Sequence, residues 1–196
     1  MSYKSSRYSE WRGGSSRSVQ AEIDFTSPGL AVMEVERLLF SGKAINSDAD
    51  EVWPKLYIGN MNIAENLEKL RRCQFTHVLN CAHSSRRGSE IYKGMGITYM
   101  GIEAQDTTTF DMSANFNTAA EFIHTALIGR GKILVHCHVG VSRSATIVLA
   151  YLMLKHNMTL VEAINTVKEG RGVIPNRGFL RQLINLHIKL HGYTSK

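Results

Sequence analysis

Segments with apolar residues at helical spacing alternate along the chain with short segments that are apolar at most positions. Helical spacing predicts amphipathic helices, and short runs rich in β-branched residues predict strands buried in a sheet. The predicted helices cover residues 29–40 and 62–72, a segment from Phe116 to about Gly129, residues 144–157 and 160–170, and a last segment after Asn176. The predicted strands cover residues 51–59, 75–81, 97–102 and 132–135. This alternation predicts a single α/β domain whose mixed sheet is covered by helices.

Three local signals refine the pattern. Pro54 lies inside the segment 51–59 and has no backbone donor, so this segment is expected to be an edge or entry strand. Thr159 and Glu162 have the spacing of a capping box, which predicts the start of a helix. Asn176 is expected to cap the last helix rather than to contact a substrate.

Residues 1–28 are rich in Ser, Arg and Gly and have no apolar periodicity, which predicts a disordered arm. The folded domain is then expected to cover residues 29–196. A chain of 196 residues with 43% hydrophobic content suits this single domain.

The net charge is +6, and half of the excess positive charge lies within the first twenty residues. The remainder is too small to indicate a nucleic-acid surface, although a basic face would suit a phosphorylated partner.

The cysteine pattern bears on the compartment of the protein. Cys73, Cys81 and Cys137 form neither a CxxC pair nor a dense, even framework, which favours a reducing environment. No N-terminal apolar segment resembles a signal peptide, and the longest apolar run, residues 145–154, is too short to span a bilayer. We therefore expect a soluble protein of the cytoplasm, the nucleus or both, without a membrane partner. The sequence leaves its oligomeric state open.

One stretch carries candidate chemistry: His136-Cys137-x5-Arg143-Ser144 joins the predicted strand 132–135 to the following helix. A loop of small residues before a helix N-terminus can bind an anion through backbone N–H groups and the helix dipole. Arg143 adds a bidentate fork that matches a phosphate group. The loop residues predicted to surround this phosphate are His138, Val139, Gly140, Val141 and Ser142.

Cys137 is the candidate nucleophile, because the helix N-terminus and Arg143 both favour its thiolate form. Attack on phosphorus would give a phosphocysteine intermediate, and the Ser144 hydroxyl is expected to make the sulfur a better leaving group afterwards. The departing oxygen needs an acid, for which we choose Asp106 in a polar loop after a predicted strand. The rival carboxylate, Asp111, is expected to be a helix N-cap.

These residues resemble the signature of the cysteine-based protein tyrosine phosphatases, and further stretches in the same order resemble the small atypical dual-specificity phosphatases. Those stretches are Glu51-Val-Trp-Pro-Lys-Leu-Tyr-Ile-Gly59, Phe75-Thr-His-Val-Leu-Asn80, Asp106, Ala150-Tyr-Leu-Met153 and Pro175-Asn176-Arg177-Gly178-Phe179-Leu180. The resemblance covers about residue 30 to the C-terminus. It implies a five-stranded sheet wrapped by helices and hydrolysis of phosphotyrosine and phosphoserine/threonine in proteins, often mitogen-activated protein kinases. The implied mechanism uses no cofactor.

The resemblance also implies roles for single residues. Cys137 matches the nucleophile, Arg143 the phosphate binder, Asp106 the general acid and Ser144 the partner of the thiolate. Arg171 matches a position that helps some relatives to bind a second substrate phosphate, and the alternative is a solvated charge at a helix end.

Cys81 matches the position of a resolving cysteine in a related lipid phosphatase, which would make it a redox partner of Cys137. The alternative is a small buried thiol. Residues 138–142 lack the lysines of the inositol-lipid phosphatases, which disfavours a phosphoinositide substrate. The chain also lacks the long tyrosine-bearing loop of strictly tyrosine-specific enzymes, so a shallow pocket is expected.

Two alternatives concern the whole site. His136, Cys137 and His138 are adjacent and cannot all face one ion, so no metal site is predicted; His136 is expected to hold the loop and His138 to lie at its rim. The second alternative is a phosphoprotein-binding module or scaffold with little turnover. The presence of Cys137, Arg143 and Asp106 together favours the enzyme.

Overall fold

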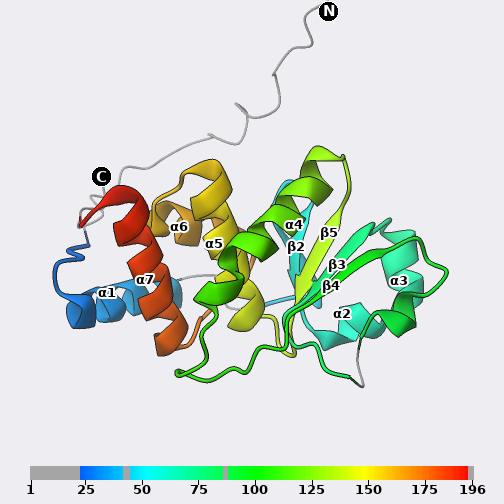
Figure 1. The fold of residues 1–196 in the computed structure, drawn as a ribbon, viewed down its shortest axis with the longest axis horizontal. Coiled ribbons are helices and arrows are strands. Elements are labelled where there is room, and N and C mark those ends of the chain that lie inside the picture. The colour runs from blue at the N-terminus through cyan, green and yellow to red at the C-terminus, as the bar shows by residue number, and fades with distance from the viewer. Residues whose placement is uncertain (1–22, 42–44, 86–87, 194–196) are drawn as a thin grey trace, which may run out of the picture.

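The computed structural model describes residues 23–41, 45–85 and 88–193. Within these residues, five strands form one sheet in the order β1-β2-β5-β3-β4. The strands are β1 (Ala49–Trp53), β2 (Leu56–Gly59), β3 (His77–Asn80), β4 (Thr98–Gly101) and β5 (Ile133–His136). β1 runs antiparallel to β2, and the other neighbouring strands run parallel. The predicted α/β fold with a mixed five-stranded sheet is confirmed (Figure 1).

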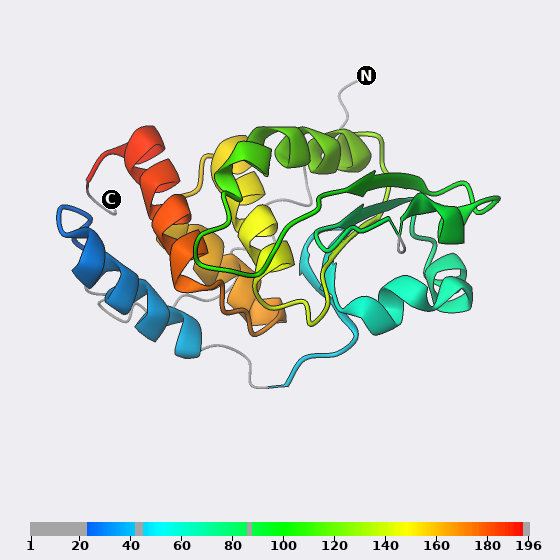
Figure 2. The same cartoon turned by 60° about the horizontal axis from the view of Figure 1, so that its bottom comes forward.

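Helices cover both faces of this sheet (Figure 2). The larger core contains Ile133 and Val135 of β5, while Leu134 points to a smaller core on the opposite face. This alternation is the two-residue period of a strand that is buried on both sides. The helices of the larger core are α1 (Pro28–Phe40), α4 (Phe116–Ile128), α5 (Arg143–His156), α6 (Leu160–Gly170) and α7 (Arg177–His191). The smaller core is covered by α2 (Met61–Glu65), α3 (Leu67–Arg72) and the 3-10 helix η1 (Ser89–Tyr92).

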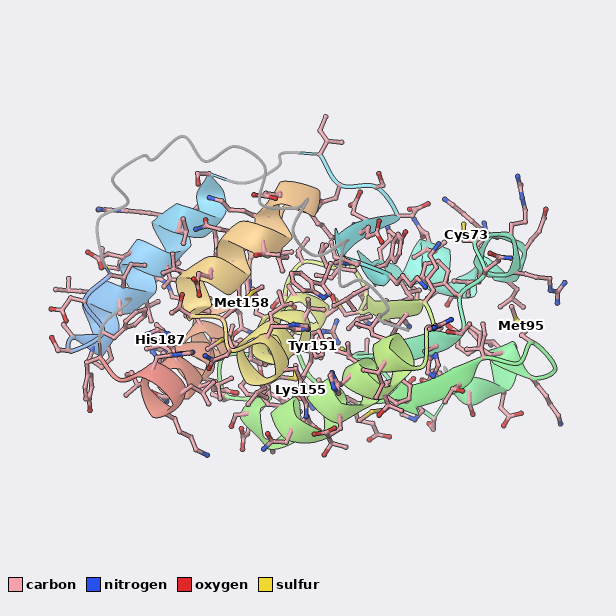
Figure 3. The ribbon with its side chains drawn as sticks, turned by 90° about the horizontal axis from the view of Figure 1, so that it is seen from above. Cys73, Met95, Tyr151, Lys155, Met158 and His187 are labelled. Carbon is pink, nitrogen blue, oxygen red and sulfur yellow. The ribbon has the colours of Figure 1, made fainter. Side chains whose placement is uncertain are left out.

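The helix α5 follows the strand β5 and forms the centre of the larger core. Every residue from Arg143 to Met153 is buried. Figure 3 shows Tyr151 near the centre of the molecule and Lys155 beside α4, where the ammonium group pairs with Glu121. In the part of the chain that the structure describes, neither α5 nor another helix has the length and apolar character needed to cross a membrane.

Two of the predicted helix caps are confirmed, and one predicted helix is wrong. The capping box of Thr159 and Glu162 is confirmed at the start of α6. The Asn176 cap is also confirmed, since its side-chain oxygen accepts from the Phe179 amide at 3.0 Å at the start of α7. The single helix predicted over residues 62–72 is wrong. Asn66 interrupts it, because its side chain accepts from the Lys69 amide at 3.0 Å and starts a new helix, α3.

The strand predicted over residues 51–59 is also two elements rather than one. The chain turns at Pro54 and Lys55, and Lys55 has a positive φ of 63°. β1 therefore lies at the sheet edge, as Pro54 suggested, whereas β2 pairs with β5 inside the sheet. The turn explains why one predicted strand is two strands, because it places Pro54 outside the hydrogen-bonded ladders of both β1 and β2.

The predicted N-terminal arm falls mostly on residues 1–22, which lie outside the described residues. For the last part of the arm the prediction is wrong. Phe25 is fully buried, and its ring centroid lies 4.2 Å from that of His187 on α7. Ile23 is also buried in the larger core. The folded domain therefore begins before residue 29.

Candidate active site

The site forms where β5 ends in the middle of the sheet. β5 lies between β2 and β3, and residues 137–142 connect it to α5, which begins at Arg143. The carboxyl ends of the parallel strands β2, β3 and β5 meet at this edge, where open α/β sheets bind their ligands. The loop is therefore held between a buried strand and a buried helix.

Cys137 lies at the floor of this loop and is only 2% exposed. Its Sγ atom lies 3.2 Å from Ser144 Oγ and accepts the backbone N–H of Gly140 at 3.2 Å. The structure thus brings Cys137 and Ser144 together, as expected. The Gly140 N–H donates to the sulfur, and the Ser144 hydroxyl donates to it as well when the sulfur carries a negative charge, which both contacts stabilise.

Gly140 has a backbone conformation that favours glycine, with a φ of +76°. A Cβ at this position would overlap the carbonyl group of Gly59 and the guanidinium of Arg171. The glycine therefore lets the loop pack against β2 while its N–H points at the sulfur of Cys137. That Gly140 also surrounds a bound phosphate, as expected from the sequence, stays a prediction, since the close contact with Gly59 alone already requires a glycine.

Arg143 is buried beside the loop. Its Nη1 donates to the Ala104 carbonyl at 3.0 Å, which connects the arginine to the segment after β4. Its Nε has no hydrogen-bond partner among the described residues and lies 4.0 Å from Asp106 Oδ2. A buried donor without a partner is costly, and an anion in the loop would satisfy it.

The other loop residues differ in exposure. His138 and Val139 lie at the exposed rim, Val139 with 65% of its surface accessible. Val141 is half-buried and Ser142 is buried. The predicted phosphate-binding loop therefore has an exposed side at His138 and Val139 and a buried side at Ser142, whose hydroxyl accepts the Asn176 backbone N–H at the start of α7.

Asp106 lies in the loop after β4, and the structure brings it to Arg143 and to the phosphate loop. Its Oδ1 accepts the Ser142 hydroxyl at 2.7 Å and the Asn176 amide at 2.9 Å. Neither contact was predicted from the sequence, although Ser142 and Asn176 both lie in stretches that resemble the phosphatase family. Asp111 instead accepts from Ser113 and Ala114, and the Ser113 hydrogen bond lowers its pKa.

Arg171 is 1% exposed, so its description as a solvated charge is wrong. Nε donates to the Gly140 carbonyl at 2.8 Å, Nη2 donates to the Val139 carbonyl at 3.2 Å, and Nη1 pairs with Asp50 at 2.7 Å. These contacts occupy the guanidinium within the protein, and the expected contact with a second substrate phosphate stays a prediction. Because a peptide is planar, holding the Val139 carbonyl orients the Gly140 N–H toward Cys137.

His136 is buried at the end of β5, and its Nδ1 lies 3.4 Å from the Cys137 carbonyl. Burial lowers the pKa of this imidazole to about 4. It is therefore neutral at physiological pH, and it contacts the loop backbone as expected of a residue that holds the loop.

Cys81 lies beside the nucleophile on the neighbouring strand. Asn80 pairs with His136 in the parallel register of β3 and β5, and the Cys81 amide donates to the His136 carbonyl at 2.8 Å. Cys81 is therefore the first residue after β3, and Cys137 is the first residue after the adjacent strand β5. Burial raises the pKa of Cys81 well above its ordinary value, the charge of Cys137 raises it further, and Arg143 opposes both.

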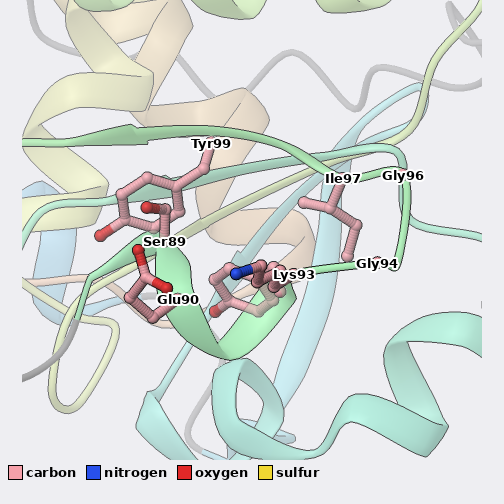
Figure 4. A pocket seen from close by; sticks show the side chains of 8 residues that line it. Ser89, Glu90, Lys93, Gly94, Gly96, Ile97 and Tyr99 are labelled. Atoms are coloured by element: carbon pink, nitrogen blue, oxygen red, sulfur yellow. The ribbon is translucent and has the colours of Figure 1, made fainter.

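A separate pocket of about 350 Å³ lies between η1 and β4. Figure 4 shows its lining, which includes Glu90, Lys93 and Tyr99. None of the residues from 136 to 144 lines it. The candidate active site is therefore identified by its chemistry and not by this hollow.

Comparisons with known proteins show the family of the chain. The family model "Dual specificity phosphatase, catalytic domain" matches residues 56–189. The chain is 61% identical over 165 residues to dual specificity protein phosphatase 26 of Homo sapiens, covering 83% of this chain and 78% of that protein. The protein of the same name from Mus musculus is 60% identical over the same shares.

Two solved structures have the same fold. Human DUSP28 aligns with a TM-score of 0.67 and 27% identity, covering 74% of this chain and 97% of that chain. A mouse putative dual specificity phosphatase, complexed with zinc tungstate, aligns with a TM-score of 0.67 and 28% identity, covering 76% of this chain and 92% of that chain. The chain therefore belongs to the small atypical dual-specificity phosphatases of the protein tyrosine phosphatase superfamily and is a dual-specificity protein phosphatase.

Proposed function

We propose that this phosphatase hydrolyses phosphotyrosine and phosphoserine/threonine in proteins through a phosphocysteine intermediate. The observation that carries the proposal is the convergence of three groups around one loop. Cys137 Sγ lies at its floor, 3.2 Å from both the Gly140 nitrogen and the Ser144 hydroxyl oxygen. Arg143 Nε has no partner within the described residues, and Asp106 Oδ2 lies 4.0 Å from that nitrogen. A phosphate group held by Arg143 would lie between the nucleophile and the acid.

In the first step, the Cys137 thiolate attacks phosphorus and forms an S–P bond as the P–O bond to the substrate breaks. Asp106 gives its proton to the departing oxygen. Arg143 and the loop N–H groups stabilise the charge on the other phosphate oxygens, so the step requires no metal or cofactor.

In the second step, water attacks the phosphocysteine and Asp106 takes a proton from that water. The S–P bond breaks, and sulfur leaves as a thiolate. The Ser144 hydroxyl, 3.2 Å from the sulfur, supports this departure by donating a hydrogen bond. Free phosphate and the starting enzyme result.

The proposed substrates are phosphorylated proteins, with mitogen-activated protein kinases as the first candidates. Residues 138–142 contain no lysine for additional ring phosphates, and the exposed Val139 at the rim suits a protein surface better than a polyanionic lipid head group. Capture of phosphoproteins by Cys137→Ser from cytoplasmic and nuclear fractions would test both the substrates and the proposed location in these compartments. Phosphoinositide hydrolysis without protein dephosphorylation would contradict the substrate class.

The decisive test of the mechanism compares wild type with Cys137→Ser in a chelating buffer. An aryl phosphate and a doubly phosphorylated kinase-loop peptide are the substrates. Wild type is expected to release phosphate from both and to form a covalent phosphoenzyme that rapid denaturation at alkaline pH preserves, whereas Cys137→Ser is expected to do neither. Tungstate, a tetrahedral oxyanion, is expected to inhibit competitively. Equal activity in the two proteins would contradict the proposal.

A further inference from the structure

The two oxygens of Asp106 have different surroundings. Oδ1 accepts two hydrogen bonds, from the Ser142 hydroxyl at 2.7 Å and from Asn176 Nδ2 at 2.9 Å. Oδ2 lies 4.0 Å from Arg143 Nε, on the side of the phosphate loop. The carboxyl group is thus held by one oxygen and presents the other to the site.

The direction of each hydrogen bond is fixed by a neighbouring bond. The Ser142 hydroxyl accepts the Asn176 backbone N–H at 3.2 Å, so its single proton points to Asp106. The side-chain oxygen of Asn176 accepts the Phe179 N–H at 3.0 Å as the cap of α7. This cap fixes which end of the amide is the nitrogen, and the NH2 group must therefore face Asp106.

We propose that Asn176 is a positioning residue for the general acid, which places the transferable proton on Oδ2 of Asp106. Because Oδ1 faces two donors, a proton on that oxygen would clash with both of them. Oδ2 carries the proton and gives it to the leaving oxygen as the P–O bond breaks, while Oδ1 keeps both hydrogen bonds. The inference rests on the proposed function and assigns to the cap of α7 a second task.

The surrounding backbone supports this docking of the acid loop on α7. The loop runs beside the first turn of α7 (Figures 1 and 2), and a Cβ at Gly178 would overlap the backbone of Thr108. One turn further along, Gln182 Nε2 donates to the Phe110 carbonyl at 2.8 Å, and Gln182 Oε1 accepts the Ser113 N–H at 2.9 Å. Asn176 is therefore one of several points that attach the loop to α7.

The test compares Asn176→Ser with Asn66→Ser. Both changes replace a capping asparagine by a serine that can still cap a helix, but only Asn176 contacts Asp106. Asn176→Ser is expected to lower kcat about 10- to 100-fold on a phosphate ester with a poor leaving group, the size of a lost hydrogen bond to a charged group. It should change kcat little on an aryl phosphate whose leaving group needs no acid. Asn66→Ser is expected to match wild type on both.

A double-mutant cycle with Asp106→Asn then separates positioning from general support of the fold. If Asn176 acts through the acid, Asn176→Ser causes no further loss in the Asp106→Asn background. An equal loss in both backgrounds, an equal loss on both leaving groups, or wild-type kcat would overturn the proposal. Inactivity of the wild type itself would instead refute the proposed function.

Gly178→Ala provides a second route if Asn176→Ser fails to fold. It leaves Asn176 in place and displaces the loop at Thr108. A selective loss on poor leaving groups is expected here too, again absent in the Asp106→Asn background. Unchanged kcat on poor leaving groups would overturn the role of α7 in holding the acid.

Discussion

The two neighbouring cysteines occupy unlike environments at the ends of β3 and β5. Cys137 has the Gly140 N–H and the Ser144 hydroxyl at its sulfur, whereas burial raises the pKa of Cys81 and keeps it a thiol. Adjacent strands lie about 4.8 Å apart, within the span that a disulfide bridges. The pair therefore combines one sulfur that contacts two polar groups of the loop with one buried thiol whose pKa is raised.

We expect mild peroxide to oxidise Cys137 to a sulfenic acid, which the Cys81 thiol then attacks to form a disulfide and release water. Non-reducing peptide mapping should find a Cys81–Cys137 bridge, and dithiothreitol should restore activity. Cys81→Ser should lose the bridge and recover less activity, because a sulfenic acid that Cys81 does not capture oxidises further to an irreversible sulfinic acid. Cys73→Ser, at a half-buried cysteine outside the site, should keep both the bridge and the recovery. Partial inactivation without this bridge would leave Cys81 as a buried thiol only.

His136 makes stability depend on pH. Its pKa is about 4 in the folded protein, lowered by burial from an ordinary value of 6.5, so the unfolded chain binds more protons between these values. Stability is therefore expected to fall as the pH drops from 6.5 toward 4. Urea unfolding at several pH values should show this slope, and His136→Gln should reduce it. Burial also lowers the pKa of His77 and His156, so part of the slope should remain. An unchanged slope in His136→Gln would contradict the assignment.

The sequence groups Cys137, Arg143 and Ser144 in one short stretch and places Asp106 after a strand, and the structure brings these four residues together. The sequence was insufficient for the contacts that hold them. Asn176 is 70 residues from Asp106 in the chain, and only the packed position of α7 brings them together. The burial of Arg171 was hidden for the same reason, since its partner Asp50 is 121 residues away.

At the scale of elements, the predicted bounds were wrong where a single asparagine or proline interrupts a longer pattern. Asn66 supplies a cap inside an otherwise helical pattern, and the turn at Pro54 divides one apolar run into a hairpin. Long periodic segments such as α4 and α7 were predictable because burial of one face sets their pattern. Local hydrogen bonds compete with that pattern only where an asparagine or proline allows them.

The ion pair between Arg171, at the end of α6, and Asp50, in β1, supports the phosphate loop. Arg171 joins Asp50 to the carbonyl groups of Val139 and Gly140. Arg171→Met is expected to lower stability by about 3 kcal/mol, because it removes the arginine partner of a largely buried carboxylate, and adding Asp50→Asn should recover part of this loss. Chemical denaturation of the wild type and of these two variants measures both effects.

The same variant distinguishes a supporting role of Arg171 from substrate binding. If Arg171 supports the loop, Arg171→Met should lower kcat/KM by a similar factor on singly and doubly phosphorylated peptides. A loss confined to the doubly phosphorylated peptide would show that the guanidinium reaches a second phosphate and would contradict the buried arrangement.

At the scale of the whole molecule, the segment before α1 closes the larger core at the end remote from the active site. Phe25 is fully buried against His187, and its amide contacts the Tyr193 carbonyl at 3.4 Å, so it connects the N-terminal segment to α7. Phe25→Ala is expected to destabilise the fold by about 3–5 kcal/mol, the usual cost of removing a buried phenyl ring. Phe40→Ala is the matched control, because Phe40 is 70% exposed and should change stability by less than about 0.5 kcal/mol. Urea unfolding followed by circular dichroism measures both, and similar values for the two variants would mean that residues before α1 are not part of the domain.

Because α7 also carries Asn176, a shift of α7 in folded Phe25→Ala should lower kcat more on poor than on good leaving groups. Loss of stability with leaving-group dependence unchanged would show instead that the first turn of α7 keeps its place without the N-terminal segment.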